Sequence, residues 1–227
     1  MGQIRTITRR GLLVGAGAVG GYALGRGWAP EMSRARGVAT VGGSAAGATD
    51  GTLILNDASL LSATPVHSHQ RVAASGDALV EALRAELKAA RSEGRCVNIG
   101  AARHSMGGQA IPREGHAITV DNAWIEPDTA AGTYRVNGGA RWSDVITALD
   151  PIGFSPAVMQ SNHDFGVAAT FSVNAHGWPV PFGPMGSTVR SLRMVLPDGD
   201  LVTASRTENA ELFRMAMGGY GLIGLIV

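Results

Sequence analysis

Residues 100–110, which read GAARHSMGGQA, are the stretch that decides the fold. The small residues in this stretch let backbone N–H groups face outward, and such a nest of amides binds anions, above all a pyrophosphate. It is not a Walker loop, because no Gly-Lys-Ser/Thr follows, and its glycine spacing does not fit GxGxxG. The stretch therefore predicts a phosphate-binding turn that also carries an imidazole, His104.

The composition indicates a folded protein with a sizeable core. The chain has 227 residues, of which 45% are apolar and only 16% charged, which argues against disorder. The net charge is +1, and no Lys/Arg cluster alternates with aromatic residues, so we expect no nucleic-acid partner. The single cysteine, Cys96, excludes an intramolecular disulfide, and its apolar neighbours predict a buried thiol.

The first 30 residues are typical of an export signal. Arg9 and Arg10 precede a weakly apolar run at 11–25, which is shorter than the roughly 20 residues that span a bilayer. Paired arginines before such a run resemble a twin-arginine signal. We therefore expect a periplasmic or otherwise extracytoplasmic protein, with an uncleaved membrane anchor or a flexible tail as the alternatives. Residues 31–52 are rich in Gly, Ala and Ser and predict a linker, so the folded domain is expected over 53–227.

Apolar periodicity and turn residues predict an α+β or mixed α/β domain. The clearest signals are a helix between Ser75 and Gly94 and a hairpin across Pro197-Asp198-Gly199-Asp200. The expected strands are 96–99, 117–120, 134–136, 189–196, 201–204 and 222–227, and the other expected helices are 142–149 and 209–217. Because the chain ends inside the last expected strand, we expect a domain that is incomplete at its C-terminus.

Two further turns are built from small residues. Residues 164–177 read DFGVAATFSVNAHG, and residues 218–224 read GGYGLIG. Three such turns in one domain predict a long, polar ligand with several parts, such as a dinucleotide.

These turns, together with NGGARWSDVITAL at 137–149, carry a resemblance to a known family. The chain resembles, over residues 58–227, the PCMH-type FAD-binding domain of the vanillyl-alcohol-oxidase-type FAD-linked oxidases. It is most similar to the cytokinin dehydrogenase and the sugar-lactone or alditol oxidase branches. The resemblance implies a flavoprotein that binds FAD, an α+β fold with two small mixed α/β subdomains, and a C-terminal substrate (cap) domain that is missing here.

In this family the first turn wraps the FAD pyrophosphate, and its histidine is often bonded to the flavin. His104 stands at that position, and an imidazole nitrogen is a nucleophile able to make the bond. The cofactor-binding residues that the resemblance implies are Gly100, Ala101, Ala102, Arg103, His104, Ser105, Gln109, Asp164, Gly166, Ala168, Ala169, Ser172, Asn174, His176 and Ile226. No catalytic base is implied, since in this family the base follows the segment present here.

Two details put limits on this prediction. The family's usual Thr-Val-Gly-Gly reads Gly166-Val167-Ala168-Ala169, and alanine would be strained if the turn required a positive φ. His67 and His69 alternate as metal ligands do, but with no third ligand near them in the sequence we expect a surface loop and no metal.

The sequence thus favours the FAD-binding part of an exported oxidoreductase that transfers a hydride from a small alcohol, lactone or sugar-type substrate to flavin. One alternative is a non-catalytic remnant that binds FAD weakly or not at all. A second is a peptidoglycan-type reductase that uses NADPH, which the presence of His104 disfavours.

Overall fold

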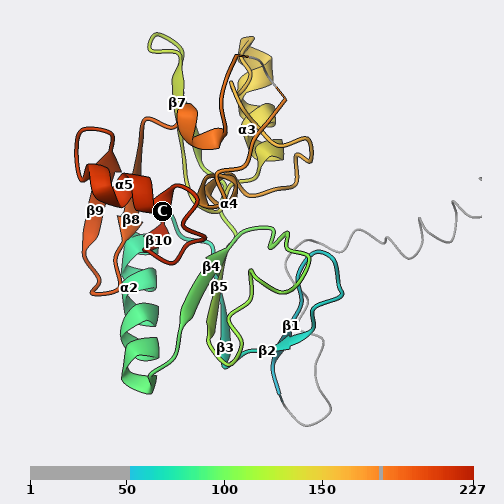
Figure 1. Ribbon diagram of the computed structural model, residues 1–227, viewed down its shortest axis with the longest axis vertical. Helices are drawn as coiled ribbons and strands as arrows, with labels where there is room; N and C mark the ends of the chain where they lie inside the picture. Colours follow the sequence, from blue (N-terminus) through green and yellow to red (C-terminus); the bar gives the residue numbers. More distant parts are fainter. Residues whose placement is uncertain (1–51, 179–180) are drawn as a thin grey trace, which may run out of the picture. The chain divides into compact units, whose positions relative to one another are not determined.

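The computed structural model describes residues 52–178 and 181–227, which lie in one compact unit of the chain (Figure 1). The expected signal or anchor at 1–30, and the expected linker apart from Thr52, fall outside the described residues. In the part that the structure describes, no helix is both long enough and apolar enough to span a membrane.

A three-stranded parallel sheet positions the first turn. It consists of β3 (Ser68–Val72), β5 (His116–Val120) and β4 (Val97–Gly100), in that order. Parallel neighbours need long connections, and helix α2 (Gly76–Glu93) supplies the connection from β3 to β4. The helix begins after Ser75 and ends at Gly94, whose φ of 66° is readily adopted only by glycine. Residues 101–115, which contain the first turn, connect β4 to β5 without a helix.

A second, antiparallel sheet contains the predicted hairpin. Strands β8 (Ser191–Val195) and β9 (Leu201–Ser205) pair with Val195 opposite Leu201, and β10 (Leu225–Ile226) pairs with the other edge of β8. The last strand is shorter than the predicted 222–227, because the Leu222 amide closes a turn onto Gly219 (3.0 Å).

The remaining elements are short. The helices are α3 (Trp142–Leu149), α4 (Val167–Ser172), α5 (Ala210–Ala216) and the 3₁₀ turns η1 (Asp150–Ile152) and η2 (Met185–Ser187). The strands are β1 (Ile54–Leu55), β2 (Thr64–Pro65), β6 (Ile125–Asp128) and β7 (Thr133–Val136).

Strand β8 separates two hydrophobic cores. Val195 packs in one core, with Leu83 of α2 and Ile118 of β5, while the adjacent Met194 packs in the other, with Trp142 and the two helices α4 and α5. Successive residues of a strand point to opposite faces, so β8 contributes to both cores. The predicted α+β domain with two small subdomains is therefore confirmed.

Two details of the prediction are wrong. Cys96 is exposed, because β4 begins one residue later and leaves the thiol outside the sheet. The second small-residue stretch is not a turn throughout, since residues 167–172 form helix α4. Gly166 precedes this helix in an extended conformation, and the two alanines that follow favour helix.

Candidate functional site

A buried arginine holds the first turn together. Arg103 has a φ of 48° and is 5% exposed. Its guanidinium points inward and donates hydrogen bonds to Asn98 Oδ1 (2.8 Å), to Ile118 O (2.6 Å) and to the carbonyl of Ala110. Burial lowers the pKa of Arg103 to about 10, so the side chain remains a cation beneath the turn at neutral pH.

A second buried charge, Asp57, braces the same turn from the opposite side. Its Oδ2 accepts hydrogen bonds from the Ser105 hydroxyl (2.8 Å) and the Gly108 amide (3.1 Å). Burial alone would raise the pKa of Asp57, but the hydrogen bonds from Ser59, Ser105 and Gly108 together bring it below its usual value. No sequence pattern indicated Asp57, because it lies 48 residues before its partner Ser105.

The turn presents donors that the protein does not use. Among residues 52–178 and 181–227, the backbone N–H groups of Ala102, His104, Met106 and Gly107 have no hydrogen-bond partner. These four amides are free donors in a turn of small residues that the buried Arg103 anchors, and such donors are what a phosphate-binding nest uses. The residues present therefore fit the pyrophosphate of FAD.

His104 belongs to a short chain of charged side chains. Its Nε2 lies 2.6 Å from Asp164 Oδ2, and Asp164 Oδ1 accepts a hydrogen bond from Arg141 (2.6 Å). The ring also packs against Phe165, with 4.6 Å between the ring centroids. Burial would raise the pKa of Asp164, but the hydrogen bond to His104 and the charge of Arg141 bring it below its usual value.

This arrangement fixes which nitrogen of His104 is free. The ionised Asp164 carboxylate accepts a hydrogen bond from Nε2–H, so a neutral ring keeps its lone pair on Nδ1. Nδ1 has no hydrogen-bond partner in the described part of the chain. An imidazole nitrogen with a free lone pair, held beside a carboxylate, is a suitable nucleophile for a covalent bond.

The second turn lies against the first. A Cβ atom on Gly166 would come within 3.3 Å of the Ala101 Cβ, so the two segments approach closely where only a hydrogen now stands. Ala168 and Ala169 lie in α4, and neither has a positive φ. The strain expected from alanine at these two positions is therefore absent.

The third turn lies against the second. The Tyr220 amide donates to Ser172 O (2.8 Å), and the Gly218 amide donates to Phe171 O (3.2 Å). Each of the three turns holds one non-glycine residue with a positive φ, namely Arg103, Asn174 and Tyr220. Such conformations persist where the surroundings impose them, and they are common at ligand sites.

The predicted cofactor-binding residues do not all line a single cavity. Ser172 donates its hydroxyl to Ala168 O (2.9 Å), and Asn174 Oδ1 accepts from the Gly186 amide (2.9 Å), so both side chains bind within the protein. Gln109 and His176 are exposed. Of the predicted residues, Ala168 and Ile226 line a cavity of about 910 Å³ whose other walls include β7 and β8. Gly100, Ala101 and the rest of the first turn lie outside that cavity.

Sequence comparison relates this site to flavoproteins. A family model described as "FAD binding domain" matches residues 78–205, which is more than half of the chain. An uncharacterized oxidoreductase of the fasciation locus of Rhodococcoides fascians is 32% identical over 55% of this chain and 28% of its own length. Alditol oxidase from a Streptomyces species is 30% identical over 63% of this chain and 34% of its own length. Cytokinin dehydrogenase 9 of Oryza sativa is 30% identical over 54% of this chain and 25% of its own length.

A solved structure supports the fold. 6-Hydroxy-D-nicotine oxidase from Arthrobacter nicotinovorans superposes with a TM-score of 0.57 and 18% sequence identity, over 65% of this chain and 33% of that protein. The chain thus matches only about a quarter to a third of the length of these relatives.

Proposed function

The chain belongs to the FAD binding domain family, and from this premise we propose that it is the flavin-holding part of an exported oxidoreductase that oxidises alcohol or sugar-type substrates. FAD is the cofactor, and the observation that carries the proposal is the first turn, which has four free backbone amides and is anchored by the buried Arg103. The substrate class rests on the likeness to alditol oxidase, which extends over 145 residues. The cytokinin dehydrogenases are matched over shorter stretches, so a cytokinin is the second candidate substrate.

Bound FAD supplies the acceptor for a hydride. The amides of Ala102, His104, Met106 and Gly107 would hold its pyrophosphate, and the buried Arg103 cation would add a favourable charge. Asp164 holds a proton on His104 Nε2, and Arg141 keeps Asp164 ionised, so that Nδ1 would be the atom available for a bond to the flavin.

Exposed apolar side chains support a binding role for this face. Met106 on the first turn is 83% exposed, Trp178 after the second is 82% exposed and Leu222 on the third is 83% exposed. Large apolar side chains that are exposed on three turns in contact with one another are typical of segments that a ligand or another part of a protein covers. We propose that the flavin and the substrate-binding part of the enzyme cover it.

Export is proposed from the sequence alone. Arg9 and Arg10 before the apolar run at 11–25 resemble a twin-arginine signal, a route taken by proteins that fold around a cofactor before export. If the signal directs export, residues 1–40 fused to a reporter will carry it out of the cytoplasm, and replacing both arginines by lysine will stop this. An unchanged location in the double variant would reject the proposal.

FAD binding is tested by titrating the purified full chain with FAD and following the quenching of flavin fluorescence. We expect saturable binding to the wild type. Met106→Glu brings a carboxylate to the phosphate nest and should weaken binding about tenfold or more, since like charges repel at short range. Met215→Glu is the matched control, because Met215 is also exposed but lies on α5. Equal affinity of the two variants would place FAD elsewhere.

The substrate class is tested by anaerobic reduction of the bound flavin. We expect alditols to bleach the flavin absorbance of the complete enzyme, while cytokinins leave it unchanged. Bleaching by cytokinins alone would replace the alcohol proposal with the second candidate. Reduction by neither compound class would reject both while leaving FAD binding intact.

A further inference from the structure

A cluster of histidine and glutamate side chains lies at the amino end of the parallel sheet. His67 precedes β3, His116 is the first residue of β5, and Glu93 is the last residue of α2. Glu93 Oε2 lies 2.8 Å from His67 Nε2 and 3.1 Å from His116 Nε2. The three ligand atoms all lie within 4.8 Å of one another. Parallel pairing of β3 with β5 sets Ser68 beside His116 and so brings together two histidines that are distant in sequence.

A second carboxylate orients the buried histidine. His116 is 3% exposed, and its Nδ1 lies 2.7 Å from Glu86 Oε1, which also accepts a hydrogen bond from the Ser68 hydroxyl (3.1 Å). A neutral His116 with its proton on Nδ1 directs the Nε2 lone pair at Glu93 and His67. Metal-binding histidines are commonly held in this way, with a carboxylate on the ring nitrogen that does not bind the metal.

Glu93 Oε2 is the common neighbour of both histidines in this cluster. With its proton on Nδ1, His116 points a lone pair at a Glu93 oxygen 3.1 Å away, and the same oxygen faces His67. Arg95 also lies near Glu93, but its Nε is 3.4 Å from Glu93 Oε2, farther than either imidazole nitrogen. The Arg95 guanidinium also donates a hydrogen bond to Glu114 O. In that tautomer, a divalent ion bonded to all three ligand atoms would replace the contact between the His116 lone pair and the Glu93 oxygen with two bonds to the metal.

We propose that His67, Glu93 and His116 bind a first-row divalent transition metal, Zn²⁺ above all, with an open fourth position. Two imidazoles and one carboxylate are ligands that suit Zn²⁺, whereas Ca²⁺ and Mg²⁺ require mostly oxygen. Tetrahedral bonds of about 2.1 Å place ligand atoms roughly 3.4 Å apart. The Glu93–His67 contact of 2.8 Å and the Glu93–His116 contact of 3.1 Å would both widen to reach this spacing, and the two imidazole nitrogens lie no more than 4.8 Å apart.

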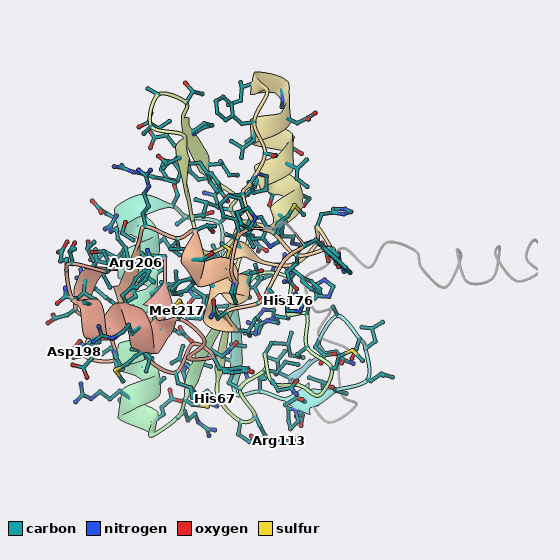
Figure 2. All side chains as sticks on the ribbon, turned by 45° about the horizontal axis from the view of Figure 1, so that its top comes forward. His67, Arg113, His176, Asp198, Arg206 and Met217 are labelled. Atoms are coloured by element: carbon teal, nitrogen blue, oxygen red, sulfur yellow. The ribbon has the colours of Figure 1, made fainter. Side chains whose placement is uncertain are left out.

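The position of the site indicates a stabilising role. Its ligands come from the end of α2 and the starts of β3 and β5, while the first turn follows the carboxyl end of β4. Figure 2 shows His67 well apart from His176, which belongs to the second turn. The metal would join the helix to the sheet at the end opposite the cofactor turn, and the inference does not depend on the proposed function.

The test is metal binding to the untagged full chain after treatment with a chelator. A competition titration against a chromophoric chelator should show one Zn²⁺ per chain, and Co²⁺ should give the visible absorption of a four- or five-coordinate ion. Zn²⁺ should raise the unfolding temperature, whereas Mg²⁺ and Ca²⁺ should leave it unchanged. Absence of saturable Zn²⁺ binding, or a lower unfolding temperature with Zn²⁺, would overturn the proposal.

Variants at the exposed ligands keep the test independent of folding. His67→Ala and Glu93→Gln each remove one ligand from a partly exposed side chain, and each should weaken Zn²⁺ binding by at least about 100-fold. Glu86→Gln should weaken it about tenfold and alter the Co²⁺ spectrum, as expected for a positioning residue. His163→Ala, at an exposed histidine outside the cluster, should change nothing. Equal effects of His67→Ala and His163→Ala would place the metal elsewhere.

Discussion

A histidine lies beside carboxylates at each end of the parallel sheet, but the number of ring nitrogens that contact a carboxylate differs between the two ends. At the carboxyl end, His104 contacts one carboxylate, Asp164, and keeps Nδ1 without a partner among the described residues. At the amino end, His116 is buried and has both ring nitrogens beside glutamates. A ring with one partner retains a nucleophilic nitrogen, whereas a ring held on both sides is fixed in place. One carboxylate beside the ring therefore suits a site for covalent attachment, and two carboxylates beside the ring suit a site for a cation.

The largest expected effect comes from removing the charge that braces the carboxyl end. Asp57→Ala leaves the Ser105 hydroxyl and the Gly108 amide without their acceptor in a buried place. We expect a loss of about 3 kcal/mol in the free energy of unfolding, measured by chemical denaturation, together with loss of FAD binding. Zn²⁺ affinity at the amino end should not change in the fraction that remains folded.

Asp121→Ala is the matched control for this variant. Asp121 forms a surface pair with Arg71, with two contacts of 2.7 Å, and exposed pairs contribute less than about 1 kcal/mol. A similar loss of stability in the two variants would mean that Asp57 is not a structural centre of the first turn.

The next effect concerns the charge on Asp164. Asp164→Asn keeps the shape of the side chain but no longer draws a proton to His104 Nε2. We expect the rate at which flavin becomes attached to the protein in an acid-stable form to fall about 10- to 100-fold. Removing a carboxylate that orients a functional histidine commonly has an effect of this size. A time course with added FAD measures this rate, and Asp198→Asn, at an exposed aspartate of the β8–β9 turn, is the control. If Asp164→Asn attached flavin as fast as the wild type, the Asp164 carboxylate would have no role in attachment at His104, and the proposed difference between the two histidines would be wrong.

The acid dependence of stability provides a smaller, independent comparison. The folded-state pKa values of Asp57 and Asp164 lie below the unfolded value of about 3.9. Their contributions are therefore complete above about pH 5 and are lost as the pH falls through the folded pKa values. We expect Asp164→Asn to flatten the acid limb of the unfolding free energy. A limb as steep as that of the wild type would mean that Asp164 has the same pKa in both states.

The smallest effect tests the backbone of the second turn. Ala169 is exposed and lies within α4, so Ala169→Gly should lower the free energy of unfolding by about 0.5–1 kcal/mol. If the alanine were strained by a positive φ, the same change would raise the stability. Thermal unfolding of the variant therefore decides between the helix and the strained turn.

Local signals made much of the fold predictable. Ser75 and Gly94 mark the two ends of α2, and Pro197-Asp198-Gly199-Asp200 marks the β8–β9 turn, so the structure has these elements close to the predicted bounds. The prediction that the Cys96 thiol is buried was wrong, because an apolar run does not show at which residue a strand begins.

The site was predictable only where its residues are consecutive. The first turn is one continuous stretch, so His104 and its neighbours could be named from the sequence. Asp57 and His116 could not, because their roles depend on partners brought close by strand pairing and loop packing. The sequence showed His67 and His69 as alternating histidines, but β3–β5 pairing selects His67 and turns His69 toward Thr119 (2.9 Å).

The most direct measurement is the flavin that stays with the polypeptide after acid precipitation of the FAD-loaded protein. His104→Ala removes the proposed attachment atom, and His163→Ala removes an exposed histidine of the same region. We predict flavin absorbance in the precipitate of the wild type and of His163→Ala, and none in that of His104→Ala. Flavin released from the wild type, or retained by His104→Ala, would contradict covalent attachment at the carboxyl end of the sheet.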